Sequence, residues 1–335
     1  MSVSLRDVAS KAQVSVGTVS NVLNRPEIVS ALTLERVQKT IKDLGFVPNA
    51  FARHLRAGFS RTLGLVVPDV ANPFFTEVAR GVEDAASKRG YAVFLCNSDE
   101  SARKEEKYIN VLIQQQVRGI LITPSDRDPA HLEALLDRGI AVTLLDRETK
   151  SRTQCSVSVD DIRGGEIAIE YLVSLGHREI AWVCGPESIP QVADRGIGVA
   201  NAAKIAEISI TTIRVPLMNA SKGEQAALEI LALPKLPTAV FCANDIVALG
   251  VMKALLDHGV RIPEQLSLIG YDDIAFAPSA AIPLTSIAQP AYQLGVASAE
   301  LIISECEDGD SHAHQQIRFQ PKLIIRASTS RRIKI

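Results

Sequence analysis

The sequence predicts an all-α helix-turn-helix headpiece followed by an α/β core of two doubly wound, parallel-sheet lobes. Two short amphipathic segments joined by a tight turn open the chain, and from residue 61 onward continuous apolar runs alternate with amphipathic ones. A length of 335 residues also exceeds what one hydrophobic core usually organises. We therefore expect a headpiece at residues 1–47, a linker at 48–60 and a core at 61–335.

The first helix is predicted at residues 5–12. Ser4 and Asp7 form a Ser-x-x-Asp start signal, in which the Ser4 hydroxyl caps a free backbone N–H and the Asp7 carboxylate lies at the positive end of the helix. Residues 13–15 make the turn that follows.

The second helix is predicted at residues 16–23, with Ser15 as its cap. Apolar side chains lie on its inward face and small or polar ones on its outward face: Val19, Val22 and Leu23 inside, and Gly17, Thr18, Ser20 and Asn21 outside. A third helix begins at Ser30 or Ala31, continues to Leu44 and ends at Gly45. Three short helices sharing one small core are expected.

The linker carries its own helix signal. Pro48 precedes Asn49, which can cap a short helix at residues 50–57 before Gly58. A helix this short is unstable in isolation, because helix nucleation is costly. This segment is therefore expected to become helical only on DNA.

The net charge of −2 conceals an asymmetry between the two parts of the chain. Residues 1–61 hold nine Lys and Arg against four Asp and Glu, a net of +5, which leaves −7 for the remainder. Phosphate backbones attract the first part and repel the second. The headpiece alone is expected to touch nucleic acid.

The spacing of the cysteines and the length of the apolar runs indicate the cellular compartment in which the protein is expected. The five cysteines are widely spaced, none lies in a CxxC pattern, and no signal segment precedes the first helix. No apolar run approaches the roughly 18 residues that span a bilayer. We expect reduced thiols, a cytoplasmic protein and no membrane partner.

The core should contain two similar lobes, because continuous apolar strands between helices are typical of parallel sheets covered on both faces. First-lobe strands are expected at residues 63–67, 92–96, 119–123 and 141–145, with helices at 74–89, 104–116 and 129–138. Second-lobe strands are expected near 157 and at 180–184, 212–215, 239–242 and 266–270.

Polar and aromatic residues follow these strands, at the edge where open α/β sheets bind ligands. The candidate pocket residues are Asn72, Phe74, Phe75, Asp146, Arg147, Arg195, Asn244, Asp272 and Gln289. Carboxylate, amide and guanidinium groups suit sugar hydroxyls, and aromatic faces cover sugar C–H groups. For the Asn and Asp residues, helix or turn capping is an open alternative at each single position.

The headpiece resembles that of the lactose/galactose-repressor family of bacterial regulators. The resemblance rests on Leu5-Arg6-Asp7-Val8-Ala9, Val14-Ser15, Thr18-Val19-Ser20, Pro48-Asn49 and Leu55-Arg56, and it extends over nearly the whole chain. It implies a homodimer on a pseudo-palindromic operator. An ordinary protein-binding three-helix module is the alternative.

The same resemblance assigns roles on DNA. It implies that Val16, Gly17 and Asn21 read base edges and that Thr18, Ser20 and Asn24 hold phosphates. Leu55 matches the family's minor-groove wedge, with Arg53 and Arg56 on adjacent phosphates. Asn21 is the strongest direct reader of this set.

The pocket residues resemble the pentose site of periplasmic ribose-binding proteins, which share the two-lobe fold. A ribose-like pentose or a nucleoside is the implied effector, although no aromatic residue stands near Met218 or Asn219. The fold implied places residues 61–158 and 290–318 in the first lobe and 159–288 and 319–335 in the second. Segments near 286–287 and 317–325 then cross between the lobes.

The resemblance implies a ligand-responsive repressor of genes for using such a sugar or nucleoside, and two other classes of protein are the alternatives. A sugar-binding transport component would carry an export signal and lack a headpiece. An enzyme would need a nucleophile–base pair, a phosphate loop or a metal pattern, and the sequence has none of these. No cofactor is implied, and no metal site is proposed, since His312 and His314 fall in a polar loop with residues 305–310 that we expect to be solvated.

Overall fold

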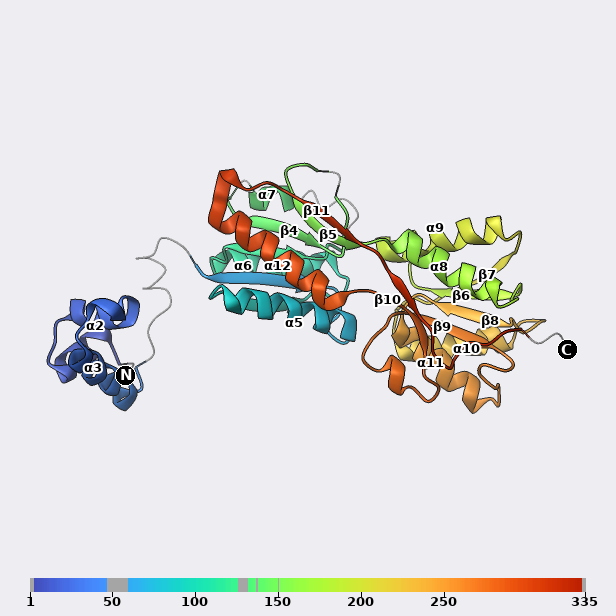
Figure 1. The fold of residues 1–335 in the computed structure, drawn as a ribbon, viewed down its shortest axis with the longest axis horizontal. Coiled ribbons are helices and arrows are strands. Elements are labelled where there is room, and N and C mark those ends of the chain that lie inside the picture. The colour runs from blue at the N-terminus through green and yellow to red at the C-terminus, as the bar shows by residue number, and fades with distance from the viewer. Residues whose placement is uncertain (1–2, 47–59, 126–131, 137, 150, 333–335) are drawn as a thin grey trace. The chain divides into compact units, whose positions relative to one another are not determined.

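The computed structural model describes residues 3–46, 60–125, 132–136, 138–149 and 151–332. Its contacts divide the chain into two compact units, Met1–Ser60 and Arg61–Ile335. The first is helical and the second consists of two α/β lobes (Figure 1). The predicted fold class is confirmed.

The three predicted headpiece helices are present, each within about one residue of its expected ends. They are α1 (Leu5–Ala12), α2 (Val16–Asn24) and α3 (Ala31–Leu44), with an additional single 3₁₀ turn, η1 (Pro26–Ile28). The Ser4 hydroxyl accepts a hydrogen bond from the Asp7 N–H at 3.3 Å, and the Asp7 carboxylate accepts one from the Ser4 N–H at 2.7 Å. The predicted capping signal therefore forms as a reciprocal pair.

The headpiece core is small and drawn from all three helices. Its buried side chains are Val8, Ala9, Ala12, Val19, Val22, Val37 and Phe46. Arg53, Leu55, Arg56 and the predicted linker helix at 50–57 lie outside the described residues.

The first lobe contains a six-stranded parallel sheet in the order β11-β5-β4-β3-β1-β2. Its strands are β1 (Thr62–Val67), β2 (Ala92–Asn97), β3 (Gly119–Ile122), β4 (Ala141–Leu145), β5 (Cys155–Val159) and β11 (Gln316–Phe319). Its helices are α5 (Pro73–Lys88), α6 (Ala102–Gln114), α7 (Glu133–Leu136) and α12 (Ala291–Asp308), with the 3₁₀ turn η4 (Gly309–Ser311).

The second lobe repeats this plan with the order β12-β10-β9-β8-β6-β7, and only β12 is antiparallel to its neighbour. Its strands are β6 (Ile180–Cys184), β7 (Ile210–Arg214), β8 (Ala239–Cys242), β9 (Ser267–Asp272), β10 (Thr285–Ala288) and β12 (Lys322–Ile324). Its helices are α8 (Asp161–Ser174), α9 (Pro190–Ile205), α10 (Ala220–Leu231) and α11 (Asp245–Asp257), with the 3₁₀ turn η3 (Ala277–Ser279).

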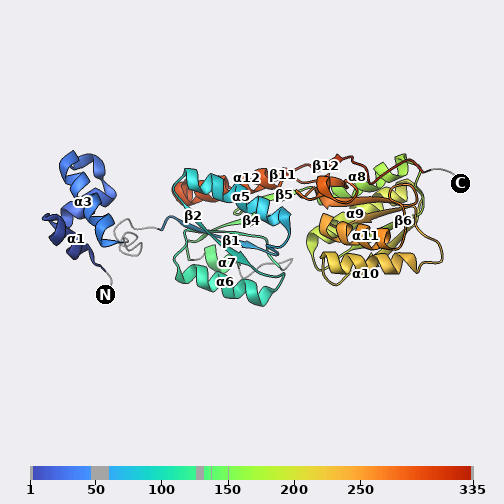
Figure 2. The same ribbon diagram turned by 90° about the horizontal axis from the view of Figure 1, so that it is seen from below.

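Both faces of each sheet are covered by helices, which explains why the strands read as continuous apolar runs. In β1, Leu63 and Leu65 belong to the core beneath α5 and α12, whereas Val66 belongs to the core beneath α6. Figure 2 shows α5 and α12 on one side of the first sheet and α6 and α7 on the other.

The chain passes between the lobes after β5, after β10 and between β11 and β12. These late crossings confirm the prediction for the segments near 286–287 and 317–325, and Figure 1 shows β10 and β11 leading from one lobe to the other. Segments that cross between two lobes are the places where hinge closure around a ligand occurs in proteins of this architecture.

Helix α8 packs against α9 through a reciprocal pair of glycines. A Cβ added at Gly165 would lie 2.2 Å from the Arg195 carbonyl oxygen, and one added at Gly198 would lie 2.0 Å from that of Ile162. The same arrangement joins two other helix pairs, through Gly81 and Gly295 (α5 with α12) and through Gly223 and Gly250 (α10 with α11). The helix backbones therefore touch directly.

All five cysteines are free thiols, as predicted. Within the described ranges, no helix combines the length and the apolarity that crossing a bilayer requires.

Candidate functional site

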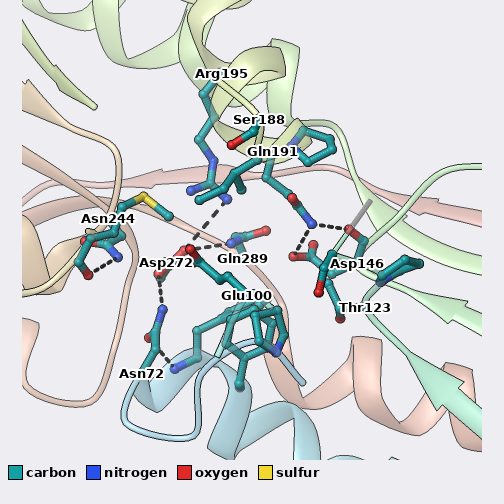
Figure 3. A pocket seen from close by; sticks show the side chains of 18 residues that line it. Asn72, Glu100, Thr123, Asp146, Ser188, Gln191, Arg195, Asn244, Asp272 and Gln289 are labelled. Atoms are coloured by element: carbon teal, nitrogen blue, oxygen red, sulfur yellow. Dashed lines mark hydrogen bonds and ion pairs between the residues drawn. The ribbon is translucent and has the colours of Figure 1, made fainter. Parts of the chain in front are cut away.

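A cavity of about 120 Å³ lies between the lobes at the carboxyl ends of the strands (Figure 3). Eight of the nine predicted pocket residues line it: Asn72, Phe74, Phe75, Asp146, Arg195, Asn244, Asp272 and Gln289. Its described lining contains neither histidine nor cysteine.

Asp272 is the centre of the hydrogen bonds in this pocket. Its carboxylate accepts from Gln289 Nε2 at 2.8 Å and from Asn72 Nδ2 at 3.4 Å, and it lies 4.0 Å from Arg195 Nη2. Burial raises the pKa of Asp272 to about 6, against the opposing effect of Arg195. Its φ of 100° is a strained left-handed conformation for a residue with a side chain.

Arg195 is the buried cation of the site. It was predicted to follow a strand of the second lobe, but it lies within helix α9. The first turns of α9 face the pocket, so a helical residue reaches the same space as the strand ends. Arg195 Nε donates to Asp161 at 2.7 Å and Nη1 to the Ala243 carbonyl at 2.7 Å.

The surroundings of Arg195 also fix its charge. Its guanidinium lies 3.7 Å from the ring centre of Tyr271, whose hydroxyl donates to Asp161 at 2.9 Å. Burial alone would lower the pKa of Arg195, but the nearby acidic groups, Asp161 foremost, raise it above its ordinary value. The pocket therefore keeps one fixed positive charge.

Asp146 forms the opposite wall of the cavity. Gln191 Nε2 donates to its carbonyl oxygen at 2.6 Å and to its Oδ2 at 3.1 Å, while Oδ1 is buried with no hydrogen-bond partner among the described residues. Its φ of 52° turns the chain sharply after β4. Burial, reinforced by the negative charge of Asp161, raises the pKa of Asp146 to about 8.

The stability of the core is expected to depend on pH through Asp146. The folded protein holds this proton up to about pH 8, whereas the unfolded chain releases it near 3.8. The free energy of unfolding therefore falls as pH rises between these values, by about 1.4 kcal/mol per pH unit, and levels off above the upper one. In Asp146→Asn, which cannot titrate, the free energy of unfolding measured by urea denaturation should fall less over this pH range than in the native chain. If it falls equally in both proteins, the raised pKa of Asp146 is contradicted.

Two pocket asparagines are helix caps as well as lining residues. Asn72 Oδ1 accepts from the Phe74 N–H at 3.0 Å at the start of α5, and Asn244 Oδ1 accepts from the Val247 N–H at 2.8 Å at the start of α11. Capping is therefore confirmed for both residues, and both also line the cavity. Phe74 and Phe75 meet edge to face, with ring centres 5.0 Å apart.

Arg147 is the predicted pocket residue that does not line the cavity; its Nη2 donates to the Pro124 carbonyl at 2.9 Å. The cavity is also lined by residues outside the nine candidates: Pro68, Glu100, Thr123, Pro124, Ser125, Ser188, Ile189, Pro190, Gln191 and Met218. Thr123 closes the predicted strand at 119–123, so the rule that found Asp146 could have found it.

The headpiece presents the predicted DNA-facing residues on α2. Val16, Gly17 and Asn21 are exposed. Thr18 and Ser20 are half-buried, and the Thr18 hydroxyl lies 2.9 Å from that of Ser15, which caps the helix through the Thr18 N–H. Asn24 is the last residue of α2.

Two family models match this chain. Residues 4–49 match bacterial regulatory proteins of the lacI family, and residues 169–329 match a periplasmic binding protein-like domain. The chain is 33% identical to the HTH-type transcriptional repressor PurR of Aliivibrio fischeri over 336 residues, which cover 98% of this chain and 99% of that protein.

Solved structures resemble both the whole chain and the core. The lac repressor dimer bound to operator and the anti-inducer ONPF has 27% identity and a TM-score of 0.85, covering 98% of this chain and 100% of that one. A LacI family transcriptional regulator from Enterococcus faecium, solved with bound ribose, has 31% identity and a TM-score of 0.75, covering 81% of this chain and 100% of that one.

Proposed function

This chain belongs to the lacI family of bacterial regulatory proteins, and we propose that its effector is a ribose-like pentose held between the lobes. As a member of that family it is a ligand-responsive, DNA-binding repressor. The proposal extends this to a cytoplasmic homodimer that controls genes for using the sugar.

The observation that carries the proposal is a set of buried oxygen atoms without partners in the cavity wall. Thr123 Oγ1, Asp146 Oδ1 and Gln289 Oε1 have no hydrogen-bond partner among the described residues. Buried polar atoms are rarely left unpaired, because each costs about 1–3 kcal/mol. Each hydroxyl of a polyol can both donate and accept a hydrogen bond, so a sugar can pair with all three of these atoms.

The size of the cavity favours one sugar over a nucleoside. Its volume of about 120 Å³ is below the roughly 300–1,000 Å³ of pockets for drug-sized ligands. The relative from Enterococcus faecium with bound ribose supports the same class of ligand. Phe74 and Phe75 supply the aromatic faces that cover sugar C–H groups.

The headpiece supports the operator half of the proposal. We assign base contacts to Val16, Gly17 and Asn21, phosphate contacts to Thr18, Ser20 and Asn24, and the minor-groove wedge with its flanking phosphates to Leu55, Arg53 and Arg56. The lac repressor dimer that resembles this chain was solved on its operator. Linkage then requires that sugar and operator change each other's affinity by the same factor.

Calorimetric titration with D-ribose, D-xylose and adenosine tests the effector. Ribose is expected to bind at one site per protomer, and Thr123→Val is expected to weaken it about tenfold, the cost of one hydrogen bond. Thr143→Val is the matched control, because Thr143 Oγ1 is also buried without a partner in β4 but does not line the cavity. Binding of adenosine alone, or equal effects of both variants, would contradict a pentose pocket. Operator binding with and without ribose gives the sign of control.

A further inference from the structure

Four side chains that can bind a metal gather in the first lobe, at the edge opposite the pocket. They are Cys155, Glu305, His312 and His314, whose ligand atoms all lie within 4.8 Å of one another. Cys155 begins β5, whereas the pocket lies where the strands end. The loop is exposed at Ser311, Ala313 and Gln315, as predicted, but the side chains of His312 and His314 are half-buried against Cys155 at the start of β5.

The distances within this cluster match those between ligands around one small cation. Cys155 Sγ lies 3.2 Å from His312 Nε2 and 3.7 Å from His314 Nδ1, and His314 Nδ1 lies 4.0 Å from Glu305 Oε2. Bond lengths of about 2.0–2.3 Å in a tetrahedron place neighbouring ligand atoms roughly 3.3–3.6 Å apart. Small side-chain shifts would complete that geometry.

Hydrogen bonds behind His312 orient the ring for binding. Ser304 Oγ donates to Asp308 Oδ2 at 2.8 Å and lies 3.0 Å from His312 Nδ1. Since the Ser304 hydrogen is given to Asp308, Nδ1 is the donor to Ser304, and the lone pair of Nε2 faces Cys155. A hydrogen bond from the other ring nitrogen fixes the tautomer and the orientation of a metal-binding histidine.

Glu305 supplies a separate indication of a missing partner. Its Oε2 is buried and has no hydrogen-bond partner among the described residues. A divalent cation would satisfy this oxygen and the buried Cys155 sulfur together.

We propose that Cys155, Glu305, His312 and His314 form a structural zinc site in the first lobe. Thiolate, two imidazoles and a carboxylate are ligand types that Zn²⁺ takes, and four protein ligands leave no open position for chemistry. The ion joins the start of β5, the end of α12 and the loop leading into β11. The site is independent of the sugar proposed for the pocket.

The test uses the untagged full-length chain, freed of metal by chelation under reducing conditions and titrated with Zn²⁺ and with Co²⁺. One ion per protomer is expected, and Co²⁺ should give a thiolate charge-transfer band with visible bands of tetrahedral cobalt. Cys155→Ser should remove the charge-transfer band and weaken Zn²⁺ binding at least tenfold. Cys96→Ser is the matched control, since Cys96 is another buried thiol of the same lobe and should change neither readout.

Two further variants keep the test decisive if Cys155→Ser does not fold. His312→Gln and His314→Gln alter half-buried side chains and should each weaken Zn²⁺ binding at least tenfold. Ser304→Ala should weaken Zn²⁺ binding about 10–100-fold, the usual effect of removing the hydrogen bond that orients a metal-binding histidine. The proposal is wrong if the native chain binds no Zn²⁺, or if both histidine variants bind Zn²⁺ as tightly as the native chain does. The four side chains would then form only a hydrogen-bonded cluster.

Discussion

Replacing Arg195 with alanine is expected to abolish measurable ribose binding and to lower the free energy of unfolding of the core by about 3–5 kcal/mol. Arg195 is the buried cation between Asp161 and Asp272, and its guanidinium also holds the Ala243 carbonyl and lies over Tyr271. Its removal leaves buried carboxylates without a counter-charge. Calorimetry with ribose and urea denaturation measure the two effects.

Arg214→Ala is the control for this variant. Arg214 lies on β7 of the same lobe and forms an ion pair with Glu187, but both side chains are largely exposed. Exposed pairs contribute little to stability, so both readouts should remain native. Unchanged ribose affinity in Arg195→Ala would show that the guanidinium does not belong to the binding site.

Adding one methyl group at Gly198 is expected to destabilise the second lobe by about 1–3 kcal/mol, the usual cost of overpacking. The new Cβ would lie 2.0 Å from the Ile162 carbonyl oxygen, so α8 and α9 must separate. Arg195 lies one turn earlier on α9 and Asp161 begins α8, so ribose affinity should fall as well. Urea denaturation and calorimetry report the two changes.

Gly196→Ala, on the same helix, is expected to raise the free energy of unfolding slightly rather than lower it. No atom lies within 4 Å of a Cβ added there, so only the helix propensity changes. Alanine in a helix interior is favoured over glycine by roughly 0.5–1 kcal/mol. Equal responses of Gly196→Ala and Gly198→Ala would contradict the direct contact between α8 and α9.

Local signals account for the elements that the sequence predicted well. Ser4 with Asp7 and the stop at Gly45 are short-range patterns, and the structure confirms both. The apolar runs of the strands predicted a sheet covered on both faces, and that is also confirmed. The order of the strands had no such signal, because it depends on contacts between distant segments.

The pocket was predictable where it follows the ends of strands and less so elsewhere. Asp146 and Asp272 were found by that rule, whereas Gln191 and Arg195 reach the cavity from the first turns of α9. Arg147 follows Asp146 directly, yet the sharp turn at Asp146 directs the Arg147 side chain to the Pro124 carbonyl. The sequence pattern does not indicate in which direction a side chain such as that of Arg147 points after a sharp turn.

The cluster around Cys155 had no local signal at all. Cys155 and His312 are separated by 157 positions, and His312-x-His314 is too short a pattern to indicate a metal site by itself. The contact exists because β11 pairs beside β5, which brings the loop before β11 to the start of β5.

The two lobes already touch across the cavity, through Asn72 with Asp272 and Gln191 with Asp146. A ligand changes the balance between two lobe arrangements only when it binds one of them more tightly than the other, and a sugar that leaves both contacts as they are creates no such preference through them. Occupancy and response are therefore separate properties of this pocket. Close analogues of the effector divide into those that signal and those that only compete, according to whether they disturb these two bridges.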